Sequence, residues 1–151
     1  MSSQKNNQPL VSIIMNCYNG ESFLHDSIKS VLMQTYQNWE LIFWDNRSED
    51  KSAEIFKSYN DKRFKYYHAS KHTLLYEARN EAIKKSSGDF IAFLDTDDFW
   101  EKDKLELQLP LFKDPKVGVV YGNFFVVNEK LNTKKIFLKK KNQEVLSWII
   151  C

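Results

Sequence analysis

The 151-residue chain lacks the features that mark secreted and membrane-spanning proteins. Its two cysteines, Cys17 and Cys151, are too few for a disulfide framework or a cysteine-rich metal site, so a reducing compartment is expected. No apolar run approaches the length of about 20 residues that a transmembrane helix needs. Residues 1–8 are polar and lack the apolar segment of a signal peptide. We therefore expect a cytoplasmic protein.

Glycine-rich phosphate loops are also missing from the sequence. The chain contains neither GxGxxG nor GxxxxGK[ST], which disfavours dinucleotide-binding and ordinary NTPase functions. The net charge of +2 is too small to indicate a nucleic-acid partner by itself, and none is expected. A protein without a phosphate-cradling loop needs a cation to hold a diphosphate.

What the chain does contain is a repeated alternation of strand and helix patterns. The predicted strands are 11–16, 40–44, 64–68, 90–94, 117–121 and 124–127, and the predicted helices are 22–34, 52–59, 73–85 and 104–112, the last interrupted by Pro110. This alternation predicts an α/β fold with a central, mostly parallel sheet flanked by helices. We expect a flexible tail over 1–9 and a single domain over 10–151.

Apolar spacing assigns the inward face of two of these helices. In the first, the inward residues are Phe23, Leu24, Ser27, Ile28, Val31 and Leu32. In the third, Thr73 is predicted to cap the helix, with Leu74, Leu75, Ala78, Ala82 and Ile83 inward.

An acid cluster follows the most apolar of the predicted strands. The run 90–94 has no polar face, which is typical of a strand covered on both sides. The chain then switches to Asp95, Thr96, Asp97 and Asp98. Carboxylates this close repel one another unless a positive group lies among them. The alternative is a solvated acidic turn that caps the next helix.

Polar groups also follow the first two predicted strands, as Tyr18-Asn19 and Asp45-Asn46. The carboxyl ends of parallel strands converge on one edge of such a sheet, where α/β folds bind ligands. This edge would present an aromatic ring for stacking a base, a polar group for reading it, and acids for a metal. Carboxylate oxygens select hard ions such as Mg²⁺ or Mn²⁺. Cys17 is expected to be a small core residue rather than a nucleophile.

Four segments occur in the order seen in family-two glycosyltransferases. They are 11–20 (VSIIMNCYNG), 40–50 (ELIFWDNRSED), 77–80 (EARN) and 87–98 (SGDFIAFLDTDD). The chain resembles this family from about Leu10 to Asn128. The resemblance implies a Rossmann-like GT-A fold, a nucleotide-diphospho-sugar donor, a divalent metal and, usually, inversion at the anomeric carbon.

The resemblance also implies roles for individual residues. Tyr18 is similar to the residue that packs on the nucleobase, with Asn19 beside it. Asp45 and Asn46 stand where the family often has two acids, the second reading the base. Because Asn46 departs from that pattern and its amide adds a donor, a uracil preference is in doubt.

The remaining roles concern the diphosphate. Arg79 resembles the arginine near the base and diphosphate, the alternative being a salt bridge on the helix surface. Asp95 and Asp97 match the DXD pattern, with Asp95 toward the ribose or the metal's water shell and Asp97 as direct metal ligand. Thr96, which lies between them, is expected to be a donor-binding residue, as is Asn19 beside Tyr18, and Asp98 is a supporting or helix-capping residue. The three histidines, His25, His68 and His72, are read as ordinary loop and strand residues.

The end of the sequence predicts a chain that is incomplete at its C-terminus. Lysines surround 136–138, and 147–151 is mostly apolar; a folded domain rarely ends on an uncovered apolar segment. The lysines fit peripheral contact with an anionic surface at the inner membrane face, or a solvated edge. In the family the general base comes from a later segment, and the late acids Glu129 and Glu144 match no motif. A glycan or lipid-linked acceptor is expected.

Two other functions remain open at this level. One is a haloacid-dehalogenase-like phosphatase, since 94–97 also resembles that family's DxD start, with Asp95 as nucleophile and Asp97 as acid or base. Its motif, however, lies on the opening strand, whereas here three strands precede it. The other is an inactive remnant or interaction module that binds donor without transferring sugar.

Overall fold

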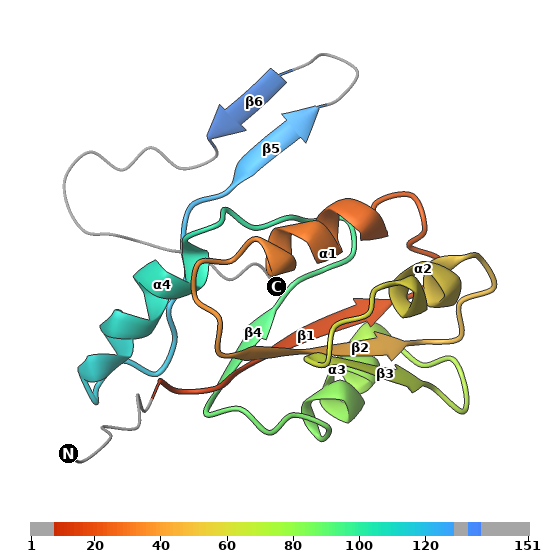
Figure 1. Ribbon diagram of the computed structural model, residues 1–151, viewed down its shortest axis with the longest axis horizontal. Coiled ribbons are helices and arrows are strands. Elements are labelled where there is room, and N and C mark those ends of the chain that lie inside the picture. Colours follow the sequence, from red (N-terminus) through yellow and green to blue (C-terminus); the bar gives the residue numbers. More distant parts are fainter. Residues whose placement is uncertain (1–7, 129–132, 137–151) are drawn as a thin grey trace.

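Four parallel strands form the main sheet of the computed structural model, which describes residues 8–128 and 133–136. They are β1 (Val11–Cys17), β2 (Trp39–Asp45), β3 (Phe64–His68) and β4 (Phe90–Phe93), in the spatial order β3-β2-β1-β4 (Figure 1). The register pairs Cys17 with Asp45 and Ile14 with Phe93. The carboxyl ends of β1 and β2 therefore lie at the same level of the sheet.

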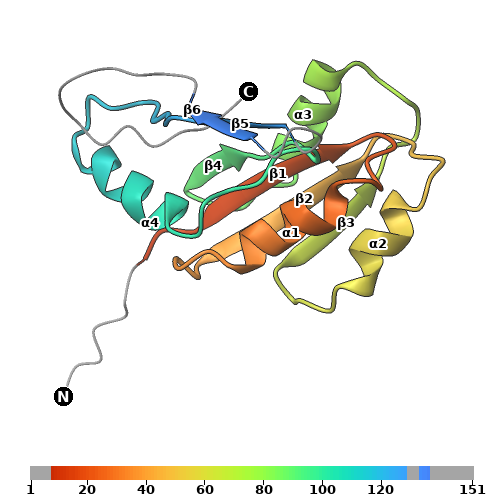
Figure 2. The same ribbon diagram turned by 90° about the horizontal axis from the view of Figure 1, so that it is seen from above.

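Helices cover both faces of this sheet (Figure 2). α1 (Leu24–Leu32) and α2 (Ser52–Ser58) pack on one face, where Leu24, Ile28 and Phe56 join the larger apolar cluster. α3 (Leu75–Ile83) packs on the other face and buries Ala78 and Ala82, whose small side chains let the helix lie close to the strands. Because β1 is covered on both sides, all seven of its residues are buried.

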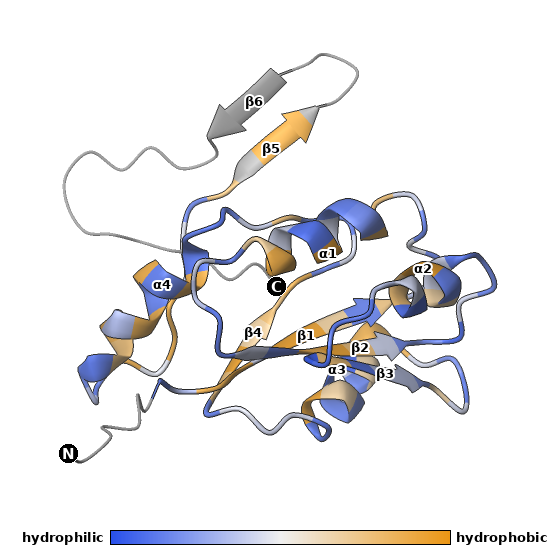
Figure 3. Ribbon diagram, in the orientation of Figure 1, coloured by the Kyte–Doolittle hydropathy of each residue, from blue (hydrophilic) through white to orange (hydrophobic). Residues whose placement is uncertain are grey.

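The remaining elements follow the acid cluster in sequence. α4 (Lys104–Gln108) leads into a 3₁₀ helix at Leu109–Lys113, and Leu105 of α4 joins the larger apolar cluster. β5 (Phe125–Asn128) and β6 (Thr133–Ile136) form a separate antiparallel pair. Figure 3 shows the hydrophobic residues concentrated in β1 and β4, with polar residues on the outer sides of the helices.

A buried carboxylate holds the amino ends of the strands together. Glu40 Oε1 accepts hydrogen bonds from Ser12 Oγ at 2.5 Å, Ser87 N at 2.7 Å and Ser87 Oγ at 3.0 Å, and Lys65 forms an ion pair with Glu40. Gly88 completes the cluster by donating its N–H to Ser12 Oγ; a Cβ there would lie 2.6 Å from Ser12 N. Burial would raise the pKa of Glu40, but the bonds from Lys65, Ser12 and Ser87 lower it to about 2.

The structure confirms the α/β alternation and corrects several details. No strand forms over 117–121, where Val119 is 74% exposed. β4 is an edge strand of the described sheet rather than a central one, so three of its four residues are only partly buried. Phe23 precedes α1 and is exposed rather than inward.

The start of α3 was also predicted wrongly. Leu74 and Leu75 are 63% and 52% exposed rather than inward. Thr73 does not cap the helix, because the N-cap is Leu74, whose N–H donates to Glu77 Oε2 at 3.3 Å. The physical reason is that the Asn46 side chain, on a neighbouring loop, forms hydrogen bonds with Thr73, as described below.

Parts of the sequence-based interpretation lie outside the described residues: most of the tail, 1–7, the late acids Glu129 and Glu144, and the segment 137–151. Within the described ranges, no helix is long and apolar enough to cross a membrane.

Candidate functional site

The candidate site lies at the carboxyl edge of the sheet, where the loops after β1, β2 and β4 meet. Backbone hydrogen bonds extend the strand pairing into these loops: Asn46 N donates to Cys17 O at 2.8 Å, and Leu94 N donates to Ile14 O at 3.0 Å. The structure therefore brings together the three segments that the sequence predicted to converge.

Side chains lock the first two loops onto one another. Asn19 N donates to Ser48 Oγ at 3.1 Å, and Asn19 Oδ1 accepts from Glu49 N at 2.8 Å. Gly20 N donates to Ser52 Oγ at 2.9 Å. Asn19 and Arg47 both adopt left-handed conformations, with φ of 54° and 72°, which Asn tolerates better than most residues. The Asn19 carboxamide thus maintains the loop on which Tyr18 is displayed.

Asp45 is an anchor for this edge. It is buried, and its two oxygens accept hydrogen bonds from Tyr66 Oη at 2.6 Å and Ser48 N at 2.7 Å. Burial and the adjacent Asp45 carboxylate raise the pKa of Tyr66. Because both of its carboxylate oxygens are hydrogen-bonded, Asp45 stabilises the loop that follows β2.

Asn46 holds the loop that follows β3. Its Nδ2 donates to Thr73 O at 2.8 Å, and its Oδ1 accepts from Thr73 N at 3.1 Å and Thr73 Oγ1 at 3.2 Å. His72 Nδ1 lies 2.9 Å from the Asn46 carbonyl oxygen. Both the nitrogen and the oxygen of the buried Asn46 carboxamide are therefore hydrogen-bonded. Because these bonds hold Thr73 in its loop, Thr73 does not cap α3.

Tyr18 presents an exposed aromatic surface at this edge. Its side chain is 52% exposed, and its ring centroid lies 4.3 Å from that of His72, with the planes tilted by 55°. Since Asn46 positions His72, an unbroken chain of contacts links the end of β2 to the Tyr18 ring.

Arg79 reaches from α3 to the acid cluster. Its Nη2 lies 2.8 Å from Asp95 Oδ1 and 3.1 Å from Asp95 Oδ2, and its guanidinium carbon is 5.7 Å from the centre of the Phe93 ring. This ion pair joins two elements and differs from the alternative of a pair along one helix surface.

The acid loop is held from the opposite face of the sheet by Ser27. Ser27 Oγ lies 2.7 Å from Thr96 O and 2.6 Å from Asp98 O, and it is buried on α1. Thr96 also packs against the first loop, since a Cβ on Gly20 would lie 2.9 Å from Thr96 Oγ1. The loop after β1 therefore contacts both of the other loops of the site.

The acids differ in their surroundings. Asp97 is exposed, and no described residue forms a hydrogen bond or ion pair with its carboxylate. Asp98 is partly buried; burial raises its pKa, and repulsion from Asp97 and then Asp95 adds to the effect. None of these acids caps α4, which begins at Lys104 with Asp103 at its N-cap. The helix-cap alternative is therefore wrong.

The donor set fits a divalent cation only in part. Within the described ranges, no group of three or more His, Cys, Asp or Glu side chains is arranged to hold a metal. Mg²⁺, however, is commonly bound by one or two carboxylates, with substrate phosphates completing the shell. Asp97 and Asp95 are the candidate pair on this loop; Asp95 is already bonded to Arg79, whereas Asp97 has no partner among the described residues.

Two residues of this edge were not singled out from the sequence. Asn16 of β1 is buried, and neither atom of its carboxamide has a hydrogen-bond partner in the described structure. It follows Ile14 by two residues and so faces the α3 side of the sheet. The sequence signal that could have identified Asn16 is a polar residue near the end of an otherwise apolar predicted strand. The second residue, His72, is read from the sequence as an ordinary residue, because the three histidines show no spacing typical of metal ligands; its contact with Tyr18 appears only in the structure.

Cys17 is a buried free cysteine, as expected. Burial raises the pKa of its thiol, which opposes formation of the nucleophilic thiolate. Cys17 therefore serves the core beneath the site.

Comparison with known proteins agrees with this geometry. Over 132 residues the chain is 40% identical to UDP-Glc:alpha-D-GlcNAc-diphosphoundecaprenol beta-1,3-glucosyltransferase WfgD of Escherichia coli, covering 87% of this chain and 52% of that protein. It is 40% identical over 104 residues to the putative teichuronic acid biosynthesis glycosyltransferase TuaG of Bacillus subtilis, covering 68% of this chain and 41% of TuaG. The chain spans about half the length of these relatives.

Solved structures show the same fold. S. aureus TarS 1-349 superposes with a TM-score of 0.61 at 27% identity, covering 64% of this chain and 30% of the TarS 1-349 chain. The mannosyltransferase PcManGT of Pyrobaculum calidifontis superposes with a TM-score of 0.72 at 20% identity, covering 83% of this chain and 37% of PcManGT. These neighbours have the GT-A fold, so the fold prediction is confirmed.

The family model for glycosyl transferase family 2 matches residues 12–146. The match includes all three loops of the site. It favours a glycosyltransferase over the haloacid-dehalogenase-like phosphatase that the acid motif left open. On this match and these relatives, the chain belongs to glycosyl transferase family 2.

Proposed function

We propose that this chain binds a nucleotide-diphospho-sugar at the carboxyl edge of its sheet and that the protein transfers the sugar to a glycan or lipid-linked acceptor. The observation that carries the proposal is that one edge of the sheet presents the exposed Tyr18 ring, the Arg79–Asp95 pair and Asp97, whose carboxylate has no partner among the described residues. An exposed ring, a guanidinium and a free carboxylate at one edge of the sheet suit a base, a diphosphate and a metal.

The relatives support a donor of this class. TarS has been solved with UDP and with UDP-GlcNAc, and PcManGT with GDP-Man and Mn²⁺. WfgD is named for a UDP-Glc donor and a diphosphoundecaprenol-linked acceptor. In this chain the Asn46 amide is committed to Thr73. We therefore assign base stacking to Tyr18 and do not assign base reading to Asn46.

The diphosphate would lie between Arg79 and the acid loop. Asp97, with Asp95, would hold Mg²⁺ or Mn²⁺, and such an ion supplies Lewis-acid stabilisation of the departing diphosphate. The Arg79 guanidinium would contribute positive charge to the same leaving group. Since Arg79 pairs with Asp95, donor binding would require this pair to be shared or opened.

Inversion at the anomeric carbon is part of the proposal. It requires a general base that removes the proton of the acceptor hydroxyl as the new bond forms. We assign none of the described residues to this role. We place the reaction in the cytoplasm, at the inner face of the membrane when the acceptor is lipid-linked.

Calorimetry with UDP-Glc, UDP-GlcNAc and GDP-Man, each with and without Mn²⁺, tests donor binding. We expect one donor to bind in a Mn²⁺-dependent manner, and Asp97→Asn to abolish the metal dependence. Asp26→Asn, which changes an exposed carboxylate on α1, is the matched control. If no donor binds with metal, or if Asp97→Asn and Asp26→Asn behave alike, the proposal is wrong.

Transfer is tested separately, by incubating the chain with the donor that binds and following release of nucleoside diphosphate. Slow hydrolysis or transfer would exclude the inactive-module alternative. Donor binding without any release would favour that alternative for this chain.

A further inference from the structure

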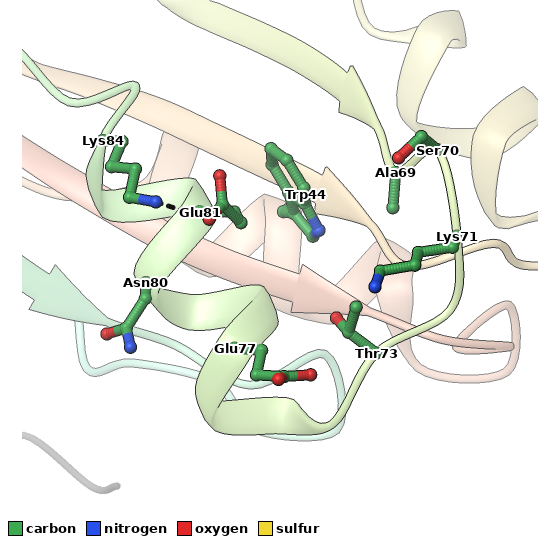
Figure 4. A pocket seen from close by; sticks show the side chains of 9 residues that line it. All are labelled: Trp44, Ala69, Ser70, Lys71, Thr73, Glu77, Asn80, Glu81 and Lys84. Atoms are coloured by element: carbon green, nitrogen blue, oxygen red, sulfur yellow. Dashed lines mark hydrogen bonds and ion pairs between the residues drawn. The ribbon is translucent and has the colours of Figure 1, made fainter.

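A polar pocket of about 620 Å³ lies on the far side of α3 from the acid cluster. Its walls are the end of β2, the segment 69–73 and one flank of α3 (Figure 4). Its volume lies within the range of roughly 300–1,000 Å³ that is typical of small-molecule sites.

α3 separates this pocket from the proposed donor site. Ala78 and Ala82 face the sheet, Arg79 projects from one flank to Asp95, and Glu77 and Glu81 project from the other flank into the pocket. These directions follow from the period of 3.6 residues per turn. The residues that line the pocket therefore do not include Tyr18, Arg79 or the acids of the proposed donor site.

One end of the pocket collects hydrogen-bond donors. The indole Nε1 of Trp44 is buried and has no hydrogen-bond partner in the described structure, although a buried tryptophan N–H usually finds one. Figure 4 shows the Lys71 ammonium directed toward this nitrogen. Lys71 forms no ion pair with any described residue, so no described carboxylate neutralises its charge.

The α3 wall of the pocket carries groups suited to hydroxyls. Glu77 uses Oε2 to accept from Leu74 N and leaves Oε1 available. Asn80 also borders the pocket but turns its carboxamide outward (Figure 4), and Glu81 is already paired with Lys84 at 2.5 Å. Acceptors on the α3 wall, together with an unpaired cation and an indole N–H on the walls formed by 69–73 and β2, suit a polyhydroxylated ring that bears one negative group.

We infer that this pocket binds a sugar carrying a single oxyanion group, with the oxyanion on Lys71 and Trp44 Nε1 and ring hydroxyls on Glu77. A sugar carboxylate and a sugar phosphate share this chemistry. The inference goes beyond donor binding and does not depend on it.

The test follows the indole N–H resonances of the ¹⁵N-labelled chain, which has four tryptophans. Trp44→Phe identifies the Trp44 signal. Glucuronate, glucose 6-phosphate, glucose and inorganic phosphate are the probes. We expect a saturable shift of the Trp44 signal with glucuronate or glucose 6-phosphate, and whichever acts identifies the oxyanion. Neutral glucose should not produce it, and inorganic phosphate should be weaker at least roughly tenfold.

Lys71→Met should weaken binding of the active probe at least roughly tenfold, because it removes a charge-assisted hydrogen bond. Lys62→Met, on another exposed lysine, is the matched control, and thermal unfolding confirms that each variant is folded. Absence of a saturable shift with either charged sugar would overturn the inference, as would equal binding by Lys71→Met. Loss of the shift when UDP and Mn²⁺ are added would assign the pocket to the donor site and also overturn it.

Discussion

Arg79 Nη2 contacts both carboxylate oxygens of Asp95, at 2.8 and 3.1 Å, and so ties α3 to the loop after β4. The side chains are 19% and 31% exposed. Pairs with this access to solvent contribute little to stability, about 0–1 kcal/mol. The contact therefore matters more for placing two charges than for holding the fold.

Arg79→Ala should lower donor affinity by roughly tenfold or more while changing the unfolding free energy by less than about 1 kcal/mol. The physical reason is the loss of the guanidinium that is proposed to contact the diphosphate and that pairs with Asp95 among the described residues. Calorimetry and urea unfolding measure the two effects. A large loss of stability with unchanged donor affinity would show that the pair is structural.

Tyr18→Leu should weaken nucleotide binding, because base stacking on an aromatic ring contributes about 1–3 kcal/mol. Tyr18→Phe keeps the ring and should bind UDP nearly as well as the original chain. Calorimetric titration with UDP compares the two. Equal affinities for the leucine and phenylalanine variants would remove Tyr18 from the binding site.

Asn16→Leu should raise stability while weakening donor binding. The substitution removes a buried carboxamide without partners, whose desolvation costs about 1–3 kcal/mol. We expect a higher Tm and a lower affinity for the donor. Asn46→Leu is the contrasting variant: its carboxamide is fully bonded to Thr73, so it should lower the Tm. A decrease in Tm for Asn16→Leu would show that the Asn16 amide is satisfied.

We expect the chain to lose folding stability in acid as Glu40 becomes protonated. Its pKa is lowered from 4.5 to about 2 in the folded chain, so its contribution is complete above pH 4.5 and is lost as the pH falls toward 2. The contribution at neutral pH is on the order of 3 kcal/mol.

Urea unfolding of the original chain and of Glu40→Gln at pH 7 and pH 3 measures this effect. The difference in unfolding free energy between the two proteins should be large at pH 7 and smaller at pH 3. Glu54→Gln, on the exposed side of α2, should show no such pH dependence. An equal difference at both pH values would show that Glu40 is not the titrating group.

Sequence patterning predicted the strand order along the chain because buried parallel strands leave continuous apolar runs, as in β1 and β2. It misplaced Leu74 and Leu75 because helical spacing does not show that Asn46 binds Thr73 and shifts the start of α3. It also predicted a strand at 117–121, where apolar residues find no neighbouring strand to pair with in the described structure.

The sequence alone determined the fold class and the gathering of Tyr18, Asp45, Asn46 and the acid cluster at one edge, because parallel strands must end together. Only the tertiary structure decided what each side chain does there. It commits Asn46 to Thr73 and Asp45 to Tyr66, and it leaves Asp97 and Tyr18 open to solvent. The reason is that hydrogen-bond partners come from segments distant in the chain, whose approach local sequence patterns do not encode.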